Sequence, residues 1–244
     1  MKVALIGYGK MGRAIERFLL ERGHEITCRI DADNRADFAS EAFCRSDVAI
    51  EFTCPAAAVE NYRESLSRGV RLVSGTTGWT ARRDEVESML AECGGTLFWS
   101  SNFSIGVNLF MRVNAYLAGL MKDFPQYRPA MKEIHHVHKL DHPSGTAISI
   151  AEEIIKADPL ITGWEEPDGT GETAMDMLPI EHEREGEVPG THIVAWTSPV
   201  DCITMEHRAF SRDGFALGAV LAAEWVAAHP GRRGLLGMEC LMPI

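Results

Sequence analysis

The chain has 244 residues, enough for one large or two modest domains with full hydrophobic cores. Its 24 basic and 35 acidic side chains give a net charge of −11, which argues against a nucleic-acid or anionic-membrane surface. No apolar run approaches the roughly 20 residues of a membrane span, and a strand pattern directly after Met1 leaves no room for a signal peptide. Six scattered cysteines without a Cys-x-x-Cys pair predict reduced, mostly buried thiols, so we expect a cytoplasmic protein.

The first hundred residues alternate between strand and helix patterns. Short apolar runs predict strands at 2–6, 25–31, 47–52, 70–74 and 96–100, and apolar residues at helical spacing predict helices at 13–22, 55–67 and 81–93. This alternation predicts an α/β fold with a Rossmann-like, doubly wound parallel sheet.

A glycine motif stands between the first predicted strand and the first predicted helix. It reads Gly7-Tyr8-Gly9-Lys10-Met11-Gly12. Gly7 would permit a tight turn, Gly9 would let a pyrophosphate approach the backbone, and Gly12 would let the helix pack closely on the strand. Asp31 ends the second strand about 20 residues later, where it would accept hydrogen bonds from a ribose diol and repel a 2′-phosphate. The context predicts a dinucleotide site that favours NADH over NADPH.

A second loop of small residues, Gly75-Thr76-Thr77-Gly78, follows the fourth predicted strand. Open α/β sheets bind ligands at the carboxyl ends of their strands. The backbone of this loop could therefore contact the nicotinamide side of a cofactor, although a plain turn is equally compatible with the motif.

The pattern changes after residue 101. Helices are predicted at 107–121, 147–157 and 214–228, and strands at 130–138, 177–182, 191–197 and 201–209, the last two as an antiparallel pair. Polar segments rich in Gly and Pro lie at 158–176 and 183–190. We expect a dinucleotide-binding domain formed by 1–101 with 214–244, because the apolar last helix must bury a face. We expect a second α+β domain at 102–213, built on a mixed, largely antiparallel sheet.

The most informative stretch runs from Glu133 to Thr146 and contains Lys139 and four of the nine histidines, namely His135, His136, His138 and His142. Its end looks like the start of a helix, with Ser144 or Thr146 as the cap. Such a helix start offers backbone N–H groups, hydroxyls and a positive dipole end to a carboxylate. Imidazoles and an ammonium supply protons near neutral pH. The stretch predicts an acidic small-molecule substrate that must be protonated.

Two other interpretations of the histidines remain open at this point, a solvated polar strand with its loop and a metal site. On a strand, His136 and His138 would share one face and His135 would lie on the other. Neither a helical His-Glu-x-x-His nor a pair of nearby cysteines supports a metal, so we expect none and favour proton donation.

The chain resembles the 4-hydroxy-tetrahydrodipicolinate reductase (dihydrodipicolinate reductase) family along nearly its whole length. The most specific matches are residues 133–139, 141–146, 75–78 and 102–104. The resemblance implies NAD(P)H-dependent reduction of a cyclic imine dicarboxylate to tetrahydrodipicolinate in lysine and diaminopimelate biosynthesis. It also implies that the second domain binds the substrate, and that its sheet assembles the chain into a homotetramer.

The resemblance assigns roles to single residues as well. It implies His135 and Lys139 as proton donors. His136, Ser144, Gly145 and Thr146 would bind the substrate. The implied cofactor contacts are Gly7, Tyr8, Gly9, Lys10, Met11, Gly12, Asp31, Gly75, Thr76, Thr77, Ser100, Ser101, Asn102 and Phe103.

The chain departs from the usual family pattern in three places. The glycine motif is one residue shorter than the Gly-x-x-Gly-basic-Met-Gly of many members. Ser100 and Ser101 stand where Ala-Pro or Ala-Ala is common, and Ala32 follows Asp31 where an Arg could meet a 2′-phosphate. Lys10 or Arg35 could still do so, which leaves NADPH open beside NADH. Two alternative functions are another dinucleotide-dependent dehydrogenase that shares only the first domain, and a nucleotide sensor without catalysis.

Overall fold

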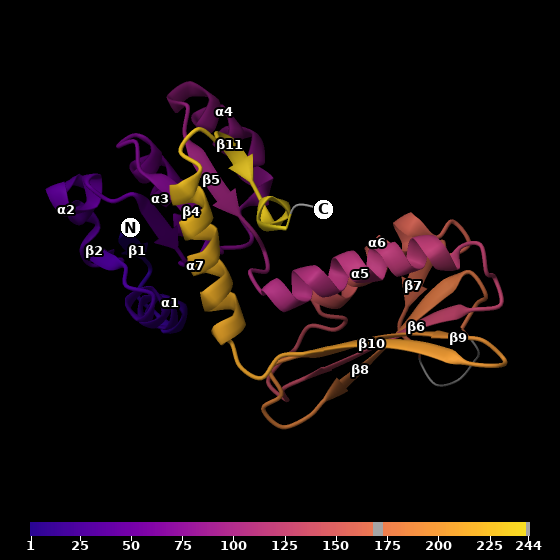
Figure 1. The fold of residues 1–244 in the computed structure, drawn as a ribbon. Coiled ribbons are helices and arrows are strands. Elements are labelled where there is room, and N and C mark those ends of the chain that lie inside the picture. The colour runs from indigo at the N-terminus through magenta and orange to yellow at the C-terminus, as the bar shows by residue number, and fades with distance from the viewer. Residues whose placement is uncertain (168–172, 243–244) are drawn as a thin grey trace. The chain divides into compact units, whose positions relative to one another are not determined.

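The structure is a computed structural model that describes residues 1–167 and 173–242. The chain forms two compact units, unit 1 with Met1–Ile105 and Asp213–Ile244, and unit 2 with Gly106–Arg212. Figure 1 shows both units as ribbons. We expected the chain to cross between its domains after residues 101 and 213. Part of the polar segment predicted at 158–176 lies outside the described residues.

Unit 1 is built on a six-stranded sheet in which every strand pair is parallel. The strands are β1 (Lys2–Ile6), β2 (Glu25–Ile30), β3 (Val48–Glu51), β4 (Arg71–Ser74), β5 (Thr96–Trp99) and β11 (Gly234–Leu236), in the order β11-β5-β4-β3-β1-β2. The five predicted strands and the doubly wound sheet are confirmed. The sequence did not predict β11, because three residues are too few to show a periodic pattern.

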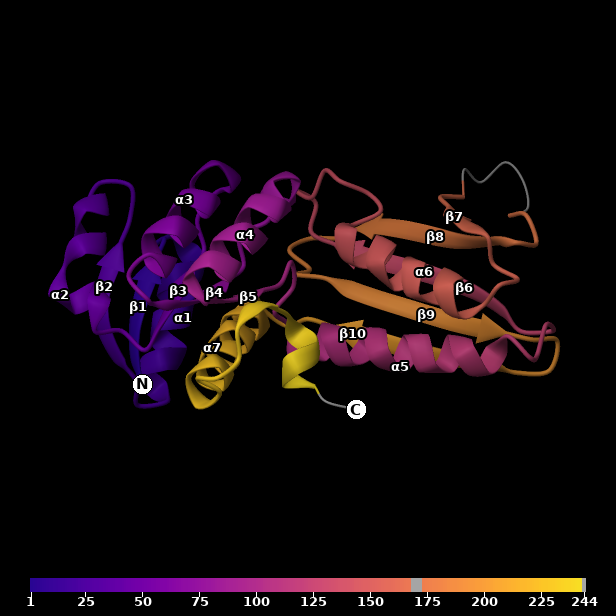
Figure 2. The same cartoon turned by 90° about the horizontal axis from the view of Figure 1, so that it is seen from above.

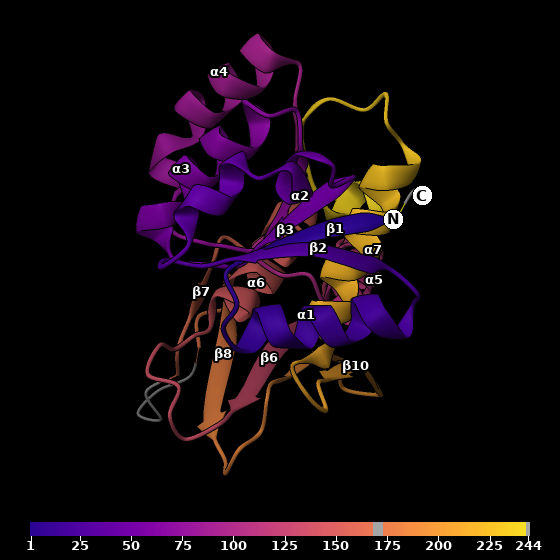
Figure 3. The same ribbon diagram turned by 90° about the vertical axis from the view of Figure 1, so that its left-hand side faces the viewer.

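Helices cover both faces of this sheet (Figure 3). One face carries α1 (Lys10–Glu21) and α7 (Asp213–Ala228), and the other carries α3 (Pro55–Leu66) and α4 (Arg83–Cys93). Val3 and Leu5 of β1 pack toward α1 and α7, whereas Ala4 and Ile6 pack toward the opposite face, because side chains alternate along a strand. Helix α7 thus buries one face against the sheet of unit 1. Short additional helices lie at α2 (Glu41–Cys44), Arg35–Ala39, Thr80–Arg82 and Met238–Leu241.

Unit 2 is built on a five-stranded mixed sheet. Its strands are β6 (Arg128–His135), β7 (Gly163–Glu165), β8 (Met177–Arg184), β9 (Thr191–Thr197) and β10 (Cys202–Arg208), in the order β10-β9-β6-β8-β7. The predicted antiparallel pairing of β9 with β10 is confirmed. Antiparallel pairs make up half of the described pairs rather than most of them, because β8 lies parallel to both β6 and β7. Helices α5 (Ile105–Met121) and α6 (Gly145–Ala157) cover one face of the sheet (Figure 2).

Two details of the sequence analysis are wrong. The strand predicted at 130–138 ends at His135, so His136 and His138 lie in the turn that follows and share no strand face. The cysteines are not mostly buried: all six are free thiols, of which Cys28 and Cys240 are partly exposed and the other four are exposed. None of the helices in the described part of the chain has the length and apolar character that a bilayer crossing requires.

Candidate functional site

The glycine motif forms a tight turn between β1 and α1. Gly7 has a φ of +89°, and its N–H donates to the carbonyl of Ile30 at 2.8 Å. A Cβ at Gly7 would overlap the carbonyl oxygen of Phe52, and a Cβ at Gly12 would overlap that of Gly7. Both positions therefore require glycine, for the turn and for the close approach of α1 to the strand. Lys10, Met11 and Gly12 form the first turn of α1.

The same turn borders a cavity of about 470 Å³ in unit 1. Among the predicted cofactor residues, Gly7, Tyr8, Gly9 and Asp31 line it. The Asp31 carboxylate accepts hydrogen bonds from the backbone N–H groups of Tyr8 (3.1 Å) and Ala32 (2.9 Å). A Cβ at Gly9 would meet nothing within 4 Å, so the space beside this residue is open. A carboxylate fixed beside an open glycine backbone fits the ribose and pyrophosphate of a dinucleotide.

The loop Gly75–Gly78 adjoins this cavity through Phe52 and Thr53, which line it. Gly75 packs against the ring of Phe52, where a Cβ would overlap the ring carbons. The N–H of Thr53 donates to the hydroxyl of Thr76 at 2.9 Å. Thr77 is exposed. The structure thus makes the two predicted cofactor loops neighbours at the carboxyl edge of the sheet.

Beneath these loops lies a buried carboxyl group, Glu51, at the end of β3. It accepts hydrogen bonds from the hydroxyls of Ser74 (2.6 Å), Thr76 (3.0 Å) and Thr53. Burial raises the pKa of Glu51, and these hydrogen bonds oppose the rise. Glu51 therefore ties the end of β3 to the Gly75–Gly78 loop.

The predicted cofactor residues after β5 form a compact turn. The hydroxyl of Ser100 donates to the carbonyl of Asn102 at 2.8 Å, and the Asn102 side chain accepts from the N–H of Ser104 at 2.9 Å. Ser101 is exposed. The Phe103 ring is buried in the core against Phe52 and Phe98, so only its backbone could contact a cofactor.

In unit 2, the strand register gathers polar side chains at the end of β6. Glu133 and His135 are two residues apart, so both point to the helix-covered face. Glu133 pairs with His192 of β9, and His135 pairs with Arg184 of β8. Directly opposed residues in neighbouring strands lie close together, which places all four in one group.

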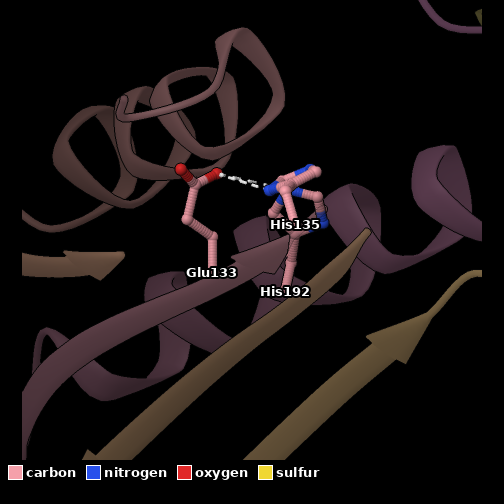
Figure 4. A group of neighbouring side chains, drawn as sticks. All are labelled: Glu133, His135 and His192. Atoms are coloured by element: carbon pink, nitrogen blue, oxygen red, sulfur yellow. Dashed lines mark ion pairs between the residues drawn. The ribbon is translucent and has the colours of Figure 1, made fainter. Parts of the chain in front are cut away.

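Figure 4 shows the core of this group. Nδ1 of His135 lies 3.4 Å from Oε2 of Glu133, and Nε2 of His192 lies 3.9 Å from the same oxygen. The rings of His135 and His192 meet edge to face, with centroids 5.3 Å apart. Burial lowers the pKa of His135, and Lys139, Arg184 and His136 add to this effect, whereas Glu133 opposes it. Burial, together with the neighbouring His135, lowers the pKa of His192 to about 3, so this ring is neutral near pH 7.

The start of α6 joins the same group. Ser144, one of the two predicted caps, is the N-cap, because its hydroxyl accepts from the N–H of Ala147 at 3.2 Å. Its own N–H donates to Oε1 of Glu133 at 3.0 Å, and its hydroxyl lies 3.4 Å from Nε2 of His192. Gly145 begins the helix, and a Cβ there would meet nothing within 4 Å. Thr146 follows in the first turn.

Lys139 lies in the loop after β6, and 21% of its side chain is exposed. Its ammonium contacts both carboxylate oxygens of Asp141, at 2.8 and 2.6 Å. Arg184 holds this loop by donating to the carbonyls of Lys139 (3.0 Å) and Asp141 (2.8 Å). The same guanidinium lies 3.6 Å from Oε1 of Glu133, so it links the loop to the buried carboxylate.

The other histidines of the run differ in their surroundings. His136 is partly buried beside His138, with ring centroids 6.1 Å apart. His138 pairs with Glu187 at 3.2 Å. His142 stacks on His182, and both rings contact Glu166, at 2.9 and 3.0 Å. Among the four histidines of this run, His135 is the only one that forms an ion pair with Glu133 in the described part of the chain.

The donor atoms of Glu133, His135 and His192 lie within 4.8 Å of one another, the spacing of a metal site. The Arg184 guanidinium already faces this carboxylate, and the positive charge of Lys139 lowers the pKa of His135. A divalent cation would have to displace or tolerate both charges. The surroundings therefore favour proton chemistry over a metal.

Three members of the group, Glu133, Arg184 and His192, were not singled out in the sequence. Glu133 could have been found, since it precedes His135 by two residues on a predicted strand. The signal for Arg184 and His192 exists only in the register of β8 and β9 with β6.

A doubly wound sheet with this glycine turn and carboxylate defines a dinucleotide-dependent oxidoreductase. Two family models match the chain, dihydrodipicolinate reductase, N-terminus, over residues 1–103 and dihydrodipicolinate reductase, C-terminus, over residues 106–242. The chain therefore belongs to the dihydrodipicolinate reductase family, as the resemblance implied.

Individual relatives agree with this assignment. A 4-hydroxy-tetrahydrodipicolinate reductase from Christiangramia forsetii is 40% identical over 231 residues, which cover 95% of this chain and 94% of the relative. One from Archaeoglobus fulgidus is 34% identical, with 93% and 94% covered. The solved structure of a dipicolinate-bound dihydrodipicolinate reductase from Paenisporosarcina sp. TG-14 has the same fold, with a TM-score of 0.79, 21% identity and 99% of both chains covered.

These relatives confirm the predicted enzyme class. The chain is an NAD(P)H-dependent reductase of lysine and diaminopimelate biosynthesis. A dehydrogenase that shares only the first domain is set aside, because the second domain matches the family as well.

Proposed function

We propose that this chain reduces 4-hydroxy-tetrahydrodipicolinate to tetrahydrodipicolinate, with loss of the hydroxyl group as water, and that the buried group around His135 supplies the proton. The names of the relatives support the substrate. The observation that carries the proposal in this chain is the arrangement of Glu133 and His135 beside the start of α6, which combines a proton donor with an anion-binding helix end.

The predicted cofactor residues belong to unit 1, and the proton-donating groups belong to unit 2. Reduced nicotinamide supplies the hydride when it is bound. Loss of the substrate hydroxyl together with a hydrogen of the adjacent ring carbon, as water, forms a carbon–carbon double bond conjugated with the imine. Hydride addition to the far carbon of this double bond leaves negative charge that develops toward the nitrogen. His135 donates a proton there, and Lys139 contributes a second proton-donating group with fixed positive charge. Such acid catalysis typically contributes 10²–10⁴-fold in rate.

The substrate carboxylates are assigned to the loop and helix start of unit 2. Gly145 and Thr146 lie in the first turn of α6, whose backbone N–H groups and dipole favour an anion. The open space at Gly145 allows a carboxylate to approach the backbone. Ser144 fixes the helix start through its capping bond, and His136 is the remaining predicted substrate contact. A dicarboxylate ring would thus be held by charge and backbone together.

We propose NADH as the preferred cofactor and NADPH as the weaker one. The Asp31 carboxylate faces the cavity and would repel a 2′-phosphate. Arg35 lines the same cavity, but its guanidinium donates to the Asn61 side chain at 2.8 Å. The remaining cofactor contacts are assigned to the Gly75–Thr77 loop and to Ser100–Phe103.

The chain is further proposed to act as a cytoplasmic homotetramer. The six free thiols suit a reducing compartment. The face of the unit 2 sheet opposite α5 and α6 presents Ala130, Lys132 and Ile134 of β6, all at least partly exposed. This face suits the subunit contact that the family resemblance implies. Light scattering of the purified chain should give four times the mass of one chain.

One coupled assay tests the reaction. The purified chain is mixed with freshly made product of dihydrodipicolinate synthase, and the loss of NADH or NADPH absorbance is followed. We expect oxidation with both cofactors and a higher kcat/KM with NADH. Binding of NADH without oxidation would support the nucleotide sensor instead, and equal or better use of NADPH would remove the proposed role of Asp31.

A further inference from the structure

The carboxylate of Glu133 is fully buried, yet one of its two oxygens is not hydrogen-bonded. Oε1 accepts from the N–H of Ser144 and faces Arg184. Oε2 is buried without a hydrogen-bond partner, and so is Nδ1 of His135, 3.4 Å away. An unpaired buried polar atom is costly, and two such atoms that face each other satisfy both needs by forming one hydrogen bond. Catalytic hydrogen bonds are often long before substrate binds and tighten afterwards.

We propose that Glu133 is a positioning residue for His135, which orients the ring so that Nδ1 carries a proton toward the carboxylate and Nε2 transfers the proton to the substrate. The inference rests on the proposed function, because it assigns the atom through which His135 acts. The hydrogen bond that one ring nitrogen of a histidine makes commonly decides which of the two nitrogens carries the proton.

The opposite side of the ring supports the assignment of Nε2. Gly190 lies beside this atom, and a Cβ at position 190 would be 3.1 Å from Nε2. Gly190 also has a φ of +154°. The glycine therefore leaves room beside Nε2, while the carboxylate covers the side of Nδ1.

The carboxylate itself is held rigidly. The Ser144 N–H fixes Oε1 at 3.0 Å, and Ser144 is the cap of α6. The ring of His192, which contacts that of His135, lies farther from Oε2 than the ring of His135 does, at 3.9 Å against 3.4 Å. His135 is thus the nearer of the two rings.

The charges around His135 make the effect of Glu133 testable by pH. The charged and titratable groups that act on the protonation of His135 come from the neighbouring strands and from the loop after β6. They are Glu133 on β6, His136 and Lys139 in the loop, Arg184 on β8 and His192 on β9. Of these five, Glu133 alone can carry negative charge. Without the negative charge of Glu133, the remaining groups all disfavour a protonated His135 ring. The pKa of His135 should therefore fall, and the protonated form should be lost at a lower pH.

The experiment compares three variants with the wild-type chain in the coupled assay. Glu133→Gln keeps the size of the side chain and one acceptor oxygen, which the Ser144 N–H requires. Its amide NH2 group then faces Nδ1 of His135, where an acceptor is needed. Glu133→Asp keeps the charge. Glu152→Gln is the matched control, because Glu152 is an exposed residue of α6 in the same unit.

For Glu133→Gln we expect kcat to fall by about 100-fold, with the KM for substrate and the Kd for NADH within about threefold of wild type. The alkaline limb of the kcat profile should move down by about one pH unit. Glu133→Asp should recover part of the rate, and Glu152→Gln should match wild type. A Glu133→Gln variant with wild-type kcat and pH profile would overturn the inference.

A second measurement does not depend on a folded variant or on activity. Nitrogen-15 NMR of the wild-type chain reports which ring nitrogen of His135 is protonated. A neutral ring with its proton on Nδ1 supports the inference, and a neutral ring with its proton on Nε2 overturns it. Failure of the wild-type chain to oxidise either cofactor would instead overturn the proposed function, so the two failures are distinguishable.

Discussion

Replacement of single glycines in the first turn separates cofactor binding from folding. Gly9 and Gly12 belong to the same motif but have different surroundings. A Cβ at Gly9 meets nothing within 4 Å, whereas a Cβ at Gly12 would overlap the carbonyl oxygen of Gly7. Gly9→Ala therefore changes only the space offered to a ligand, and Gly12→Ala also forces α1 away from the turn.

The expected magnitudes follow from these contacts. Gly9 is the N-cap of α1 in an extended conformation, so alanine there should cost about 1 kcal/mol or less in the free energy of unfolding. The Gly12 overlap is with backbone, which cannot rotate away, and overpacking of this kind costs about 1–3 kcal/mol. At about 2–4 °C per kcal/mol for a chain of this size, Gly12→Ala should lower Tm by several degrees. Both variants should weaken NADH binding at least tenfold, or about 1.4 kcal/mol.

The assay is thermal unfolding by circular dichroism together with NADH titration by fluorescence. Gly231→Ala serves as control, because a Cβ there also meets nothing within 4 Å. We expect Gly9→Ala to lose NADH affinity with a Tm close to wild type. An unchanged Kd in Gly9→Ala would refute the reasoning, since it would mean that no pyrophosphate approaches this residue.

Three further predictions concern side chains of both units. Lys139→Met should lower kcat by about 100-fold or more and leave the Kd for NADH unchanged, and turnover within a few-fold of wild type would exclude Lys139 as a proton donor. Gly190→Ala should reduce kcat about tenfold, because its Cβ would crowd Nε2 of His135, and a normal rate would show that this side of the ring is not used. The raised pKa of Glu51 means that its neutral form stabilises the fold fully below the unfolded-state pKa, near 4.5, and that this stability is lost as pH rises through the folded-state pKa. The Tm of Glu51→Gln should therefore rise relative to that of wild type as the pH increases above the unfolded-state pKa of Glu51, whereas a constant difference would refute the buried-acid account.

The histidine run shows which part of a strand a local sequence pattern can predict and which part it cannot. Residues 130–138 alternate like one strand, but pairing of β6 with β8 stops at His135, opposite Arg184. Beyond it the N–H of Lys139 donates to the carbonyl of His136 at 3.1 Å, which turns the chain. The sequence could not predict this end, because it depends on where the neighbouring strand ends.

The burial of individual side chains also could not be predicted from the sequence. Cysteine is among the residue types most often found buried, yet four of these six are exposed. Phe103 belongs to a motif that resembles a cofactor contact, but its ring fills the core beside Phe52 and Phe98. Side-chain exposure depends on which element covers a position, which is a property of the whole fold.

The sequence by itself determined the elements and the chemistry present. Periodicity predicted the strands of the doubly wound sheet, and Ser144 marked the start of α6, because each depends on interactions within a few residues. The glycine spacing predicted the turn after β1, with Asp31 contributing to it from the end of the next strand. Only the tertiary structure decided that His192 and Arg184 join Glu133 and His135 in one group. The contacts of His135 with Arg184 and His192 join residues about 50 positions apart through strand register, and register is set by packing of the sheet against α5 and α6 rather than by any local signal.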